Sequence, residues 1–212
     1  MPPPDAIIFD FNGTLSDDEP ILCEIFRTLF AEHGRPLTAE QYYDELAGLS
    51  DPEIVRTWLG RDHPDVDAVI DERVERYRAA VAGGSSVHGD VREAVHYAAK
   101  RVPLAICSGA ARAEIEPVVE AAGLAGCFRA IVSSDDVEHG KPDPEGYVQA
   151  LRLLANPQNA LVFEDTEAGI ASAKGAGLHV IAKRGTLPPA RLAAADELVD
   201  RIDRTLIERC LS

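Results

Sequence analysis

Short apolar runs, each followed by a helix-like segment, constrain the fold of this chain most strongly. The first run covers residues 6–9, ends at Asp10 and precedes the turn signal Asn12-Gly13-Thr14. Strands that alternate with helices predict an α/β fold: a Rossmann-like, doubly wound parallel sheet with helices on both faces. The further runs lie at 102–107, 128–132, 160–163 and 178–181, and the helix-like segments at 91–101, 112–122, 144–155 and 167–176.

Residues 17–83 depart from this alternation. Their apolar residues recur at helical spacing, and the flexible run Gly83-Gly84-Ser85-Ser86 follows. We therefore expect a helical cap domain at 17–83, inserted into an α/β core domain made of residues 1–16 and 84–212. The segments 17–20 and 83–86 would be its two hinge linkers.

The overall charge limits the class of partner. The formal net charge of −15 argues against a nucleic acid or an anionic membrane, because both need a basic protein surface. The four cysteines are scattered, without zinc-like spacing, and are expected to be reduced thiols. The N-terminus lacks the basic and apolar regions of a signal peptide, so we expect a cytoplasmic protein. Monomer and homodimer both remain open.

Four polar motifs follow four of the predicted strands, at the sheet edge where open α/β sheets bind ligands. Asp10 ends the first strand, and a carboxylate there can act as a nucleophile that accepts phosphorus. Asp10 and Asp165 together offer hard oxygen ligands of the kind that Mg²⁺ prefers. The adjacent acids Glu164 and Asp165 repel each other unless a cation intervenes. The motifs are DFNGTLSD at 10–17, CSGA at 107–110, GKPDP at 140–144 and FEDTEAGI at 163–170.

With these motifs in this order, the sequence resembles the haloacid dehalogenase superfamily over essentially the whole chain. It looks like the branch with a helical cap after the first motif, which includes phosphoglycolate phosphatase and β-phosphoglucomutase. The resemblance implies a Mg²⁺-dependent hydrolase of a small phosphorylated metabolite, acting through a phosphoaspartate on Asp10. It also implies that the metal is held by Asp10, Asp165 and the backbone carbonyl of Asn12, with Glu164 beside it directly or through water.

The resemblance further implies a set of phosphate-binding groups. Ser108 and the amide of Gly109 would donate to the phosphoryl oxygens, and Lys141 would supply a fixed cation. Thr14 belongs to this set either through its side chain or through its backbone alone. Together with Asp10 and Asn12, Lys141 completes the candidate catalytic residues.

Asn12 departs from the family pattern, in which most phosphatases and mutases carry aspartate two residues after the nucleophile. That aspartate protonates the leaving oxygen and then deprotonates the attacking water. An amide cannot exchange protons at neutral pH, so a contribution of ~10²–10⁴-fold should be missing here. Three accounts stay open: a slow enzyme that favours good leaving groups, replacement by Asp17, Asp18 or Glu19 near the hinge, or an engineered substitution.

The residues of the expected cap domain help to choose among the activities known in this family. Residues 17–83 contain no lysine, which disfavours the Schiff-base chemistry of phosphonatase relatives. The stretch Gly48-Leu49-Ser50-Asp51 has an acid where β-phosphoglucomutase relatives have an arginine that grips a second phosphate. A substrate with one phosphate is therefore favoured. A sugar phosphomutase, and a catalytically weakened phosphate-binding or regulatory protein, remain as alternatives.

Overall fold

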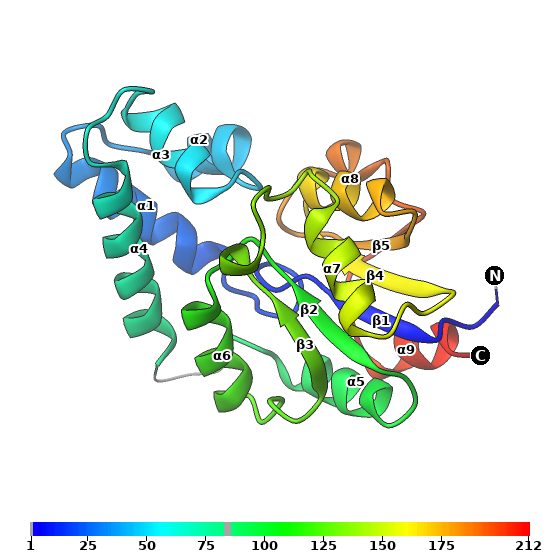
Figure 1. The fold of residues 1–212 in the computed structure, drawn as a ribbon. Helices are drawn as coiled ribbons and strands as arrows, with labels where there is room; N and C mark the ends of the chain where they lie inside the picture. The colour runs from blue at the N-terminus through cyan, green and yellow to red at the C-terminus, as the bar shows by residue number, and fades with distance from the viewer. Residues whose placement is uncertain (1, 83–85) are drawn as a thin grey trace.

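A parallel β-sheet of six strands lies at the centre of the computed structural model, which describes residues 2–82 and 86–212 (Figure 1). The strand order is β3-β2-β1-β4-β5-β6, and every neighbouring pair is parallel. The strands are β1 (Ala6–Phe9), β2 (Leu104–Cys107), β3 (Phe128–Val132), β4 (Ala160–Glu164), β5 (His179–Lys183) and β6 (Glu197–Val199).

The middle strands are buried on both faces. Every residue of β1, β2 and β4 is buried, whereas the edge strands β3 and β6 are largely half-buried. This explains why the sequences of the central strands are continuously apolar and do not alternate with polar residues, as expected for a parallel sheet covered by helices. Because all strands run the same way, the residues that follow β1, β2 and β4 meet at one edge of the sheet.

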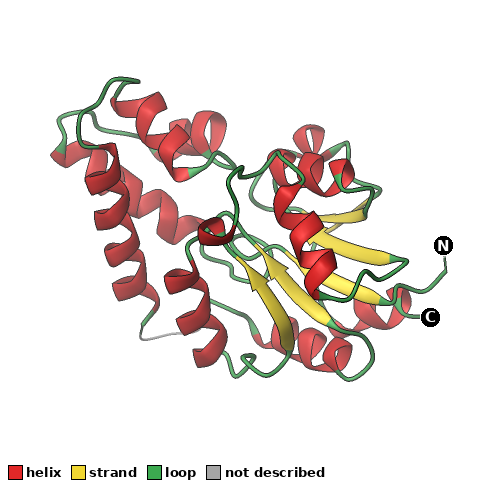
Figure 2. Ribbon diagram, in the orientation of Figure 1, coloured by secondary structure: helices red, strands yellow, loops and turns green. Residues whose placement is uncertain are grey.

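Helices cover both faces of this sheet (Figures 1 and 2). α7 and α8 lie over one face, and α5 and α9 pack against each other on the other. The predicted fold class is confirmed, and the predicted strands and helices agree with the structure to within about two residues at each end. β6 and α9 were not predicted. The helices are α5 (Gly89–Ala99), α6 (Arg112–Ala121), α7 (Glu145–Leu153), α8 (Glu167–Gly175) and α9 (Arg204–Cys210), with short 3-10 turns η2 (Ser134–Asp136) and η3 (Pro189–Leu192).

A second group of helices stands beside the sheet, on the side away from both chain termini (Figure 1). Within it α1 and α3 pack against α4, and α4 also contacts α6 of the α/β part. We keep the division into a cap and a core domain as a proposal; its second boundary, at 83/84, lies outside the described residues. The group comprises α1 (Glu19–Glu32), α2 (Ala39–Gln41), the π-helix η1 (Tyr42–Leu46), α3 (Asp51–Leu59) and α4 (Val66–Val81).

The two chain segments that join this group to the sheet lie side by side. The backbone N–H of Asp17 donates to the carbonyl of Ser86 at 2.8 Å, and the Ser16 and Ser86 hydroxyls are 2.6 Å apart. α1 already begins at Glu19, so only the first half of the predicted linker 17–20 is non-helical. Of the predicted linker 83–86, only Ser86 belongs to the described residues.

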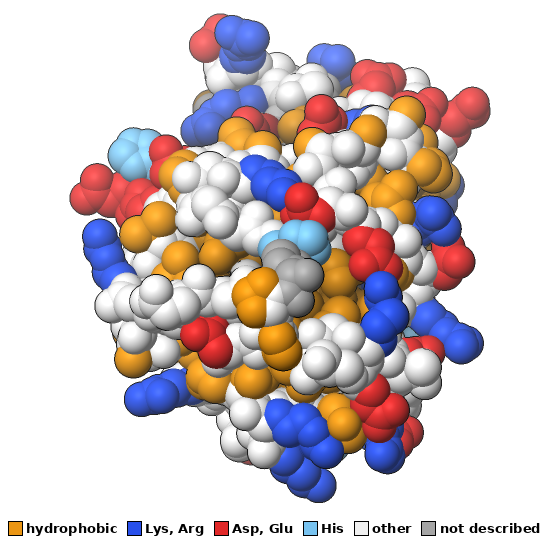
Figure 3. Space-filling view, turned by 90° about the vertical axis from the view of Figure 1, so that its right-hand side faces the viewer, with side chains coloured by type: hydrophobic (Ala, Val, Ile, Leu, Met, Phe, Trp, Pro, Cys, Tyr) orange, Lys and Arg blue, Asp and Glu red, His pale blue; other side chains and the backbone are white. Residues whose placement is uncertain are grey.

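The outer surface of the α/β part mixes both signs of charge. On the face seen in Figure 3, acidic side chains are interspersed with lysine and arginine. Although the net charge is −15, the acidic side chains on this face do not form one continuous patch. Within the described residues, the helices are too short or too polar to span a membrane.

A buried ion-pair network joins α4 to α6. Arg73 is 3% exposed and pairs with Glu114, which is 1% exposed, and its Nε lies 3.3 Å from the Asp51 carboxylate. The guanidinium also lies over the rings of Phe26 and Tyr77. Since one cation serves the buried Glu114 and the half-buried Asp51, removal of the cation leaves both acids without compensation.

We predict that Arg73→Met, which keeps side-chain bulk but removes the charge, lowers the free energy of unfolding by about 3–5 kcal/mol. The matched variant Arg76→Met, on the same helix, breaks exposed pairs with Glu32 and Glu72 and should cost less than about 1 kcal/mol. Urea denaturation of both variants measures the difference. Equal losses would contradict a buried network that depends on Arg73.

Candidate active site

Asp10 lies at the tip of β1, where the chain turns sharply. Its backbone N–H donates to the carbonyl of Phe163 on β4, and the N–H groups of Leu15 and Ser16 both donate to the carbonyl of Phe11. The turn requires glycine at position 13, where φ is +72°. A Cβ atom on Gly13 would lie 1.9 Å from Oδ2 of Asp165, so the loop can approach that acid only without a side chain.

Lys141 joins two of the acids. Its Nζ donates to Oδ1 of Asp10 at 2.6 Å and to Oε1 of Glu164 at 2.5 Å. Burial raises the pKa of Asp10 to about 7, with Lys141 lowering it and Glu164 raising it. Burial lowers the pKa of Lys141, but the two carboxylates raise it by more, so the lysine stays charged. The structure thus brings Lys141 next to the first-strand carboxylate, and its predicted role toward phosphate stays a prediction.

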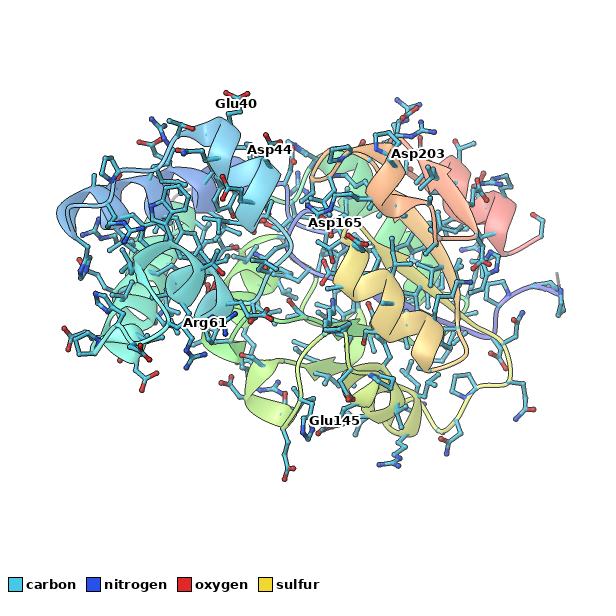
Figure 4. All side chains as sticks on the ribbon, turned by 90° about the horizontal axis from the view of Figure 1, so that it is seen from above. Glu40, Asp44, Arg61, Glu145, Asp165 and Asp203 are labelled. Carbon is cyan, nitrogen blue, oxygen red and sulfur yellow. The ribbon has the colours of Figure 1, made fainter. Side chains whose placement is uncertain are left out.

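Glu164 and Asp165 lie at the end of β4 and are held by different donors. Tyr147 donates to Glu164 at 2.9 Å, on the oxygen that also accepts from Lys141. The hydroxyls of Thr14 and Thr186 donate to the two oxygens of Asp165, the first at 3.1 Å. Asp165 lies between the α1–α4 group and α8 in the view of Figure 4.

The acids at this edge form a donor set that fits a divalent cation. Asp10, Glu164 and Asp165 each offer a carboxylate oxygen, and these atoms lie within 4.8 Å of one another. Burial, then the charges of Asp10 and Glu164, raise the pKa of Asp165 well above its usual range. Lys141 alone therefore does not offset the negative charge gathered here. Hard oxygen ligands of this kind suit Mg²⁺.

The side-chain amide of Asn12 points at Asp18, in the predicted linker 17–20. Its Nδ2 donates to Oδ2 of Asp18 at 3.0 Å, and the same carboxylate accepts from the N–H of Gly13 at 3.3 Å and from the hydroxyl of Tyr77 on α4. Asp18 is fully buried. Asn12 itself is half-buried and lines the same cavity as Asp10. The Asn12 side chain is thus oriented by its hydrogen bond to Asp18.

The predicted phosphate-binding residues divide into two groups. Ser108 and Gly109 follow β2 and line the cavity with Asp10 and Lys141; the Ser108 hydroxyl accepts from the N–H of Ala110 at 3.1 Å. Thr14 is buried and donates to Asp165, and it is not among the cavity-lining residues that the structure describes. A phosphate-binding role for Thr14 stays a prediction; its observed contact positions an acid.

The cavity has a volume of about 960 Å³ and is enclosed by both parts of the molecule. The sheet edge contributes Asp10 and Lys141, and the helical group contributes the whole stretch 48–51. Asp51 lies beside Arg73, so the acid expected to repel a second phosphate already has a cationic neighbour. Tyr42, Leu49 and Arg56 of the helical group also line the cavity.

Sequence reasoning missed Arg73 altogether and left Glu19 as one of three possible acids. Both line the cavity. One feature of the sequence could have indicated Arg73: it lies on the otherwise apolar face of its helix, beside Val69 and Tyr77. Its partners Asp51 and Glu114 are distant in sequence, so their pairing could not be read from spacing.

Comparison with known proteins decides the family, because the model of the haloacid dehalogenase-like hydrolases matches residues 4–177. The chain belongs to the haloacid dehalogenase-like hydrolase family. The chain is 31% identical over 215 residues to validoxylamine A 7′-phosphate phosphatase of Streptomyces hygroscopicus subsp. limoneus, with 91% of each chain covered. It is 29% identical over 192 residues to a phosphorylated carbohydrates phosphatase of Thermotoga maritima, with 84% of this chain and 83% of the relative covered.

A solved structure agrees with this chain in fold. CbbY from Rhodobacter sphaeroides, in complex with phosphate, superposes with a TM-score of 0.82 at 27% identity, covering 94% of this chain and 95% of that one. The predicted family is confirmed. The predicted enzyme class, a haloacid dehalogenase-like phosphatase, is confirmed at this level as well, because the chain is a hydrolase of the family and the relatives above are phosphatases by name.

Gly13→Ala should impair this hydrolase far more than a matched glycine variant. Gly123→Ala has the same kind of backbone, with φ of +73°, but open space for the new methyl group, so each variant should cost about 1–2 kcal/mol of backbone strain. Only Gly13→Ala also displaces Asp165. Urea denaturation and the rate of p-nitrophenyl phosphate hydrolysis separate the two effects; retained activity in Gly13→Ala would contradict the close approach.

Proposed function

We propose that this chain is a Mg²⁺-dependent phosphatase of small phosphomonoesters that forms a phosphoaspartate on Asp10. The observation that carries the proposal is the position of the Asp10 carboxylate, which lies in the cavity wall, 2.6 Å from the Lys141 ammonium and beside two further acids. A carboxylate in this setting has a partner for the negative charge of an incoming phosphoryl group. It also has an open side from which that group can approach.

The protein groups divide the work of phosphoryl transfer. Asp10 attacks phosphorus, and the bond to the leaving oxygen breaks as the new bond forms. Lys141 and the Ser108–Gly109 turn bear the charge of the phosphoryl oxygens, contributing roughly 3 kcal/mol for each well-placed donor. Water then hydrolyses the phosphoaspartate and restores the Asp10 carboxylate. Enclosure of the cavity by the helical group limits the access of water to the first step.

Asp10, Asp165 and the backbone carbonyl of Asn12 would hold the metal, with Glu164 beside them. The ion supplies positive charge that neutralises the phosphate and orients it for attack. Glu164 has a further structural role, because its oxygens accept hydrogen bonds from Lys141, Tyr147 and the N–H of Asp165. Glu164 thereby fixes the lysine on which Asp10 depends.

The substrate is proposed to be a phosphorylated carbohydrate or a similar polar metabolite with one phosphate. The named relatives act on validoxylamine A 7′-phosphate and on phosphorylated carbohydrates. The cavity wall also carries Glu19, Asp51 and Glu114 against Arg73 and Arg56, a balance that does not favour a second dianionic group. Multiple turnovers of inorganic phosphate release would exclude the alternative of a sugar phosphomutase, and any turnover would exclude a silent binding protein.

Asp10→Asn should lower phosphatase activity by about 10³-fold or more, because an amide cannot form the acyl-phosphate bond. The measurement is the release of inorganic phosphate from a panel of phosphorylated metabolites. Asp62→Asn is the matched control, since Asp62 is an exposed aspartate in the loop between α3 and α4. A substantial rate in Asp10→Asn would overturn the phosphoaspartate.

Mg²⁺ should raise the thermal midpoint of the native chain and be required for turnover. At a concentration of about 100 times its Kd, the ion adds about 2.7 kcal/mol of stability, which corresponds to a shift of about 5–10 °C for a chain of this size. Calorimetric scans with Mg²⁺ and with chelator measure the shift. Asp165→Asn should lose most of it; an equal shift in that variant would place the ion elsewhere.

A further inference from the structure

Asn12 leaves the proposed reaction without a proton carrier at the usual position, and the cavity contains a candidate to replace it. An alkoxide leaves poorly unless it is protonated, and the water that attacks the phosphoaspartate must lose a proton. The replacement must be titratable, must reach the cavity and must not be fully engaged by other groups. The described carboxyl groups in and around the cavity can be compared on these three requirements.

Most of these carboxyl groups are already engaged. Asp18 is buried behind Asn12 and accepts three hydrogen bonds. Asp51 and Glu114 are paired with Arg73. Each therefore already has a hydrogen-bond or ion-pair partner.

Three further acids of the cavity wall are exposed and lie at its rim. Glu53 accepts from the backbone and hydroxyl of Ser50 at the start of α3, and Asp143 accepts from the N–H of Glu145 at the start of α7. Glu138 is exposed to solvent in the loop before Lys141. All three are exposed to solvent, whereas the proton carrier must act in the enclosed part of the cavity.

Glu19 meets all three requirements. It is the first residue of α1, directly after Asp18, and it lines the cavity with Asp10 and Asn12. The Tyr42 hydroxyl donates to its Oε1 at 2.9 Å, which fixes the side chain. Within residues 2–82 and 86–212, Oε2 of Glu19 has no hydrogen-bond donor, so this oxygen is available to a substrate or a water molecule.

The surroundings of Glu19 favour proton exchange near neutral pH. Burial raises its pKa to about 7, while the hydrogen bond from Tyr42 lowers it. The charges of Asp18 and Asp10 raise the pKa, and the charge of Arg73 on α4 lowers it. A general acid–base group works best when its pKa is near the working pH.

We propose that Glu19 is the general acid–base residue of this enzyme, in the role that Asn12 cannot fill; the inference rests on the proposed phosphatase function. Protonated Glu19 gives its proton to the leaving oxygen as the phosphorus–oxygen bond breaks and the Asp10–phosphorus bond forms. The resulting Glu19 carboxylate takes a proton from water as the water oxygen attacks phosphorus. Inorganic phosphate leaves, and both Asp10 carboxylate and Glu19 acid are restored.

The test uses two substrates of similar shape and unequal leaving group. p-Nitrophenyl phosphate releases a phenolate that needs no proton, whereas benzyl phosphate releases an alkoxide that does. For Glu19→Gln, kcat/KM for benzyl phosphate should fall by about 10²-fold or more, while kcat/KM for p-nitrophenyl phosphate stays near the native value. Because Glu19 also serves the second step, p-nitrophenyl phosphate should show a burst of nitrophenolate followed by slow turnover.

The pH profile gives a second readout. In the native enzyme, kcat/KM for benzyl phosphate should fall as the pH rises through about 7, because the proton on Glu19 is lost. Glu19→Gln should lack this decline, since its amide does not titrate. An equal loss for both substrates, or an unchanged pH profile in Glu19→Gln, would assign Glu19 to binding or packing and overturn the proposal.

Rescue and control variants separate this inference from the proposed function. Asn12→Asp should restore benzyl phosphate turnover in the Glu19→Gln background. Glu24→Gln, an exposed acid on the same helix, should match the native enzyme in both activity and pH profile. If Asp10→Asn is inactive and Glu19→Gln is unimpaired, only the role of Glu19 fails; if Asp10→Asn is active, the phosphoaspartate mechanism itself fails.

Discussion

The ammonium group of Lys141 lies between the carboxylates of Asp10 and Glu164, and the arrangement of the site depends on this contact. Two acids from neighbouring strands would repel each other in a buried setting, and the lysine turns that repulsion into attraction toward a shared cation. Tyr147 and the backbone after β4 then fix Glu164, so the lysine is anchored from the side opposite the nucleophile. Asp165 adds a third carboxylate beside this pair, and the three acids form a donor set that fits a metal ion.

Much of the fold and part of the site could be predicted from the sequence, for a physical reason. β1 and the motif after it are contiguous, so burial, strand order and the meeting of strand ends place Asp10 near Glu164 without knowledge of the tertiary packing. β6 escaped prediction because its three half-buried residues at the sheet edge form no continuous apolar run. The short helix α9, with seven residues, offered equally little periodicity.

The contacts of the helical group could not be predicted in the same way. Arg73 meets Glu114 across 41 residues, and Tyr77 meets Asp18 across 59, so both contacts depend on how α4 packs against the rest of the molecule. Sequence could name Asp17, Asp18 and Glu19 as acids near the hinge, but it could not rank them. Burial and hydrogen bonding distinguish them, because Asp18 faces Asn12, Glu19 faces the cavity, and Asp17 is exposed beside His88.

The Arg73–Glu114 pair has a consequence for how molecules enter. α4 belongs to the helical group and α6 to the α/β part, and both residues border the cavity. Any movement that separates these two helices must pull the guanidinium of Arg73 away from the carboxylate of Glu114 and hydrate both. The attraction between Arg73 and Glu114 therefore opposes any separation of α4 from α6 when a ligand enters. A polar ligand that offers either charge a new partner can reduce this opposition.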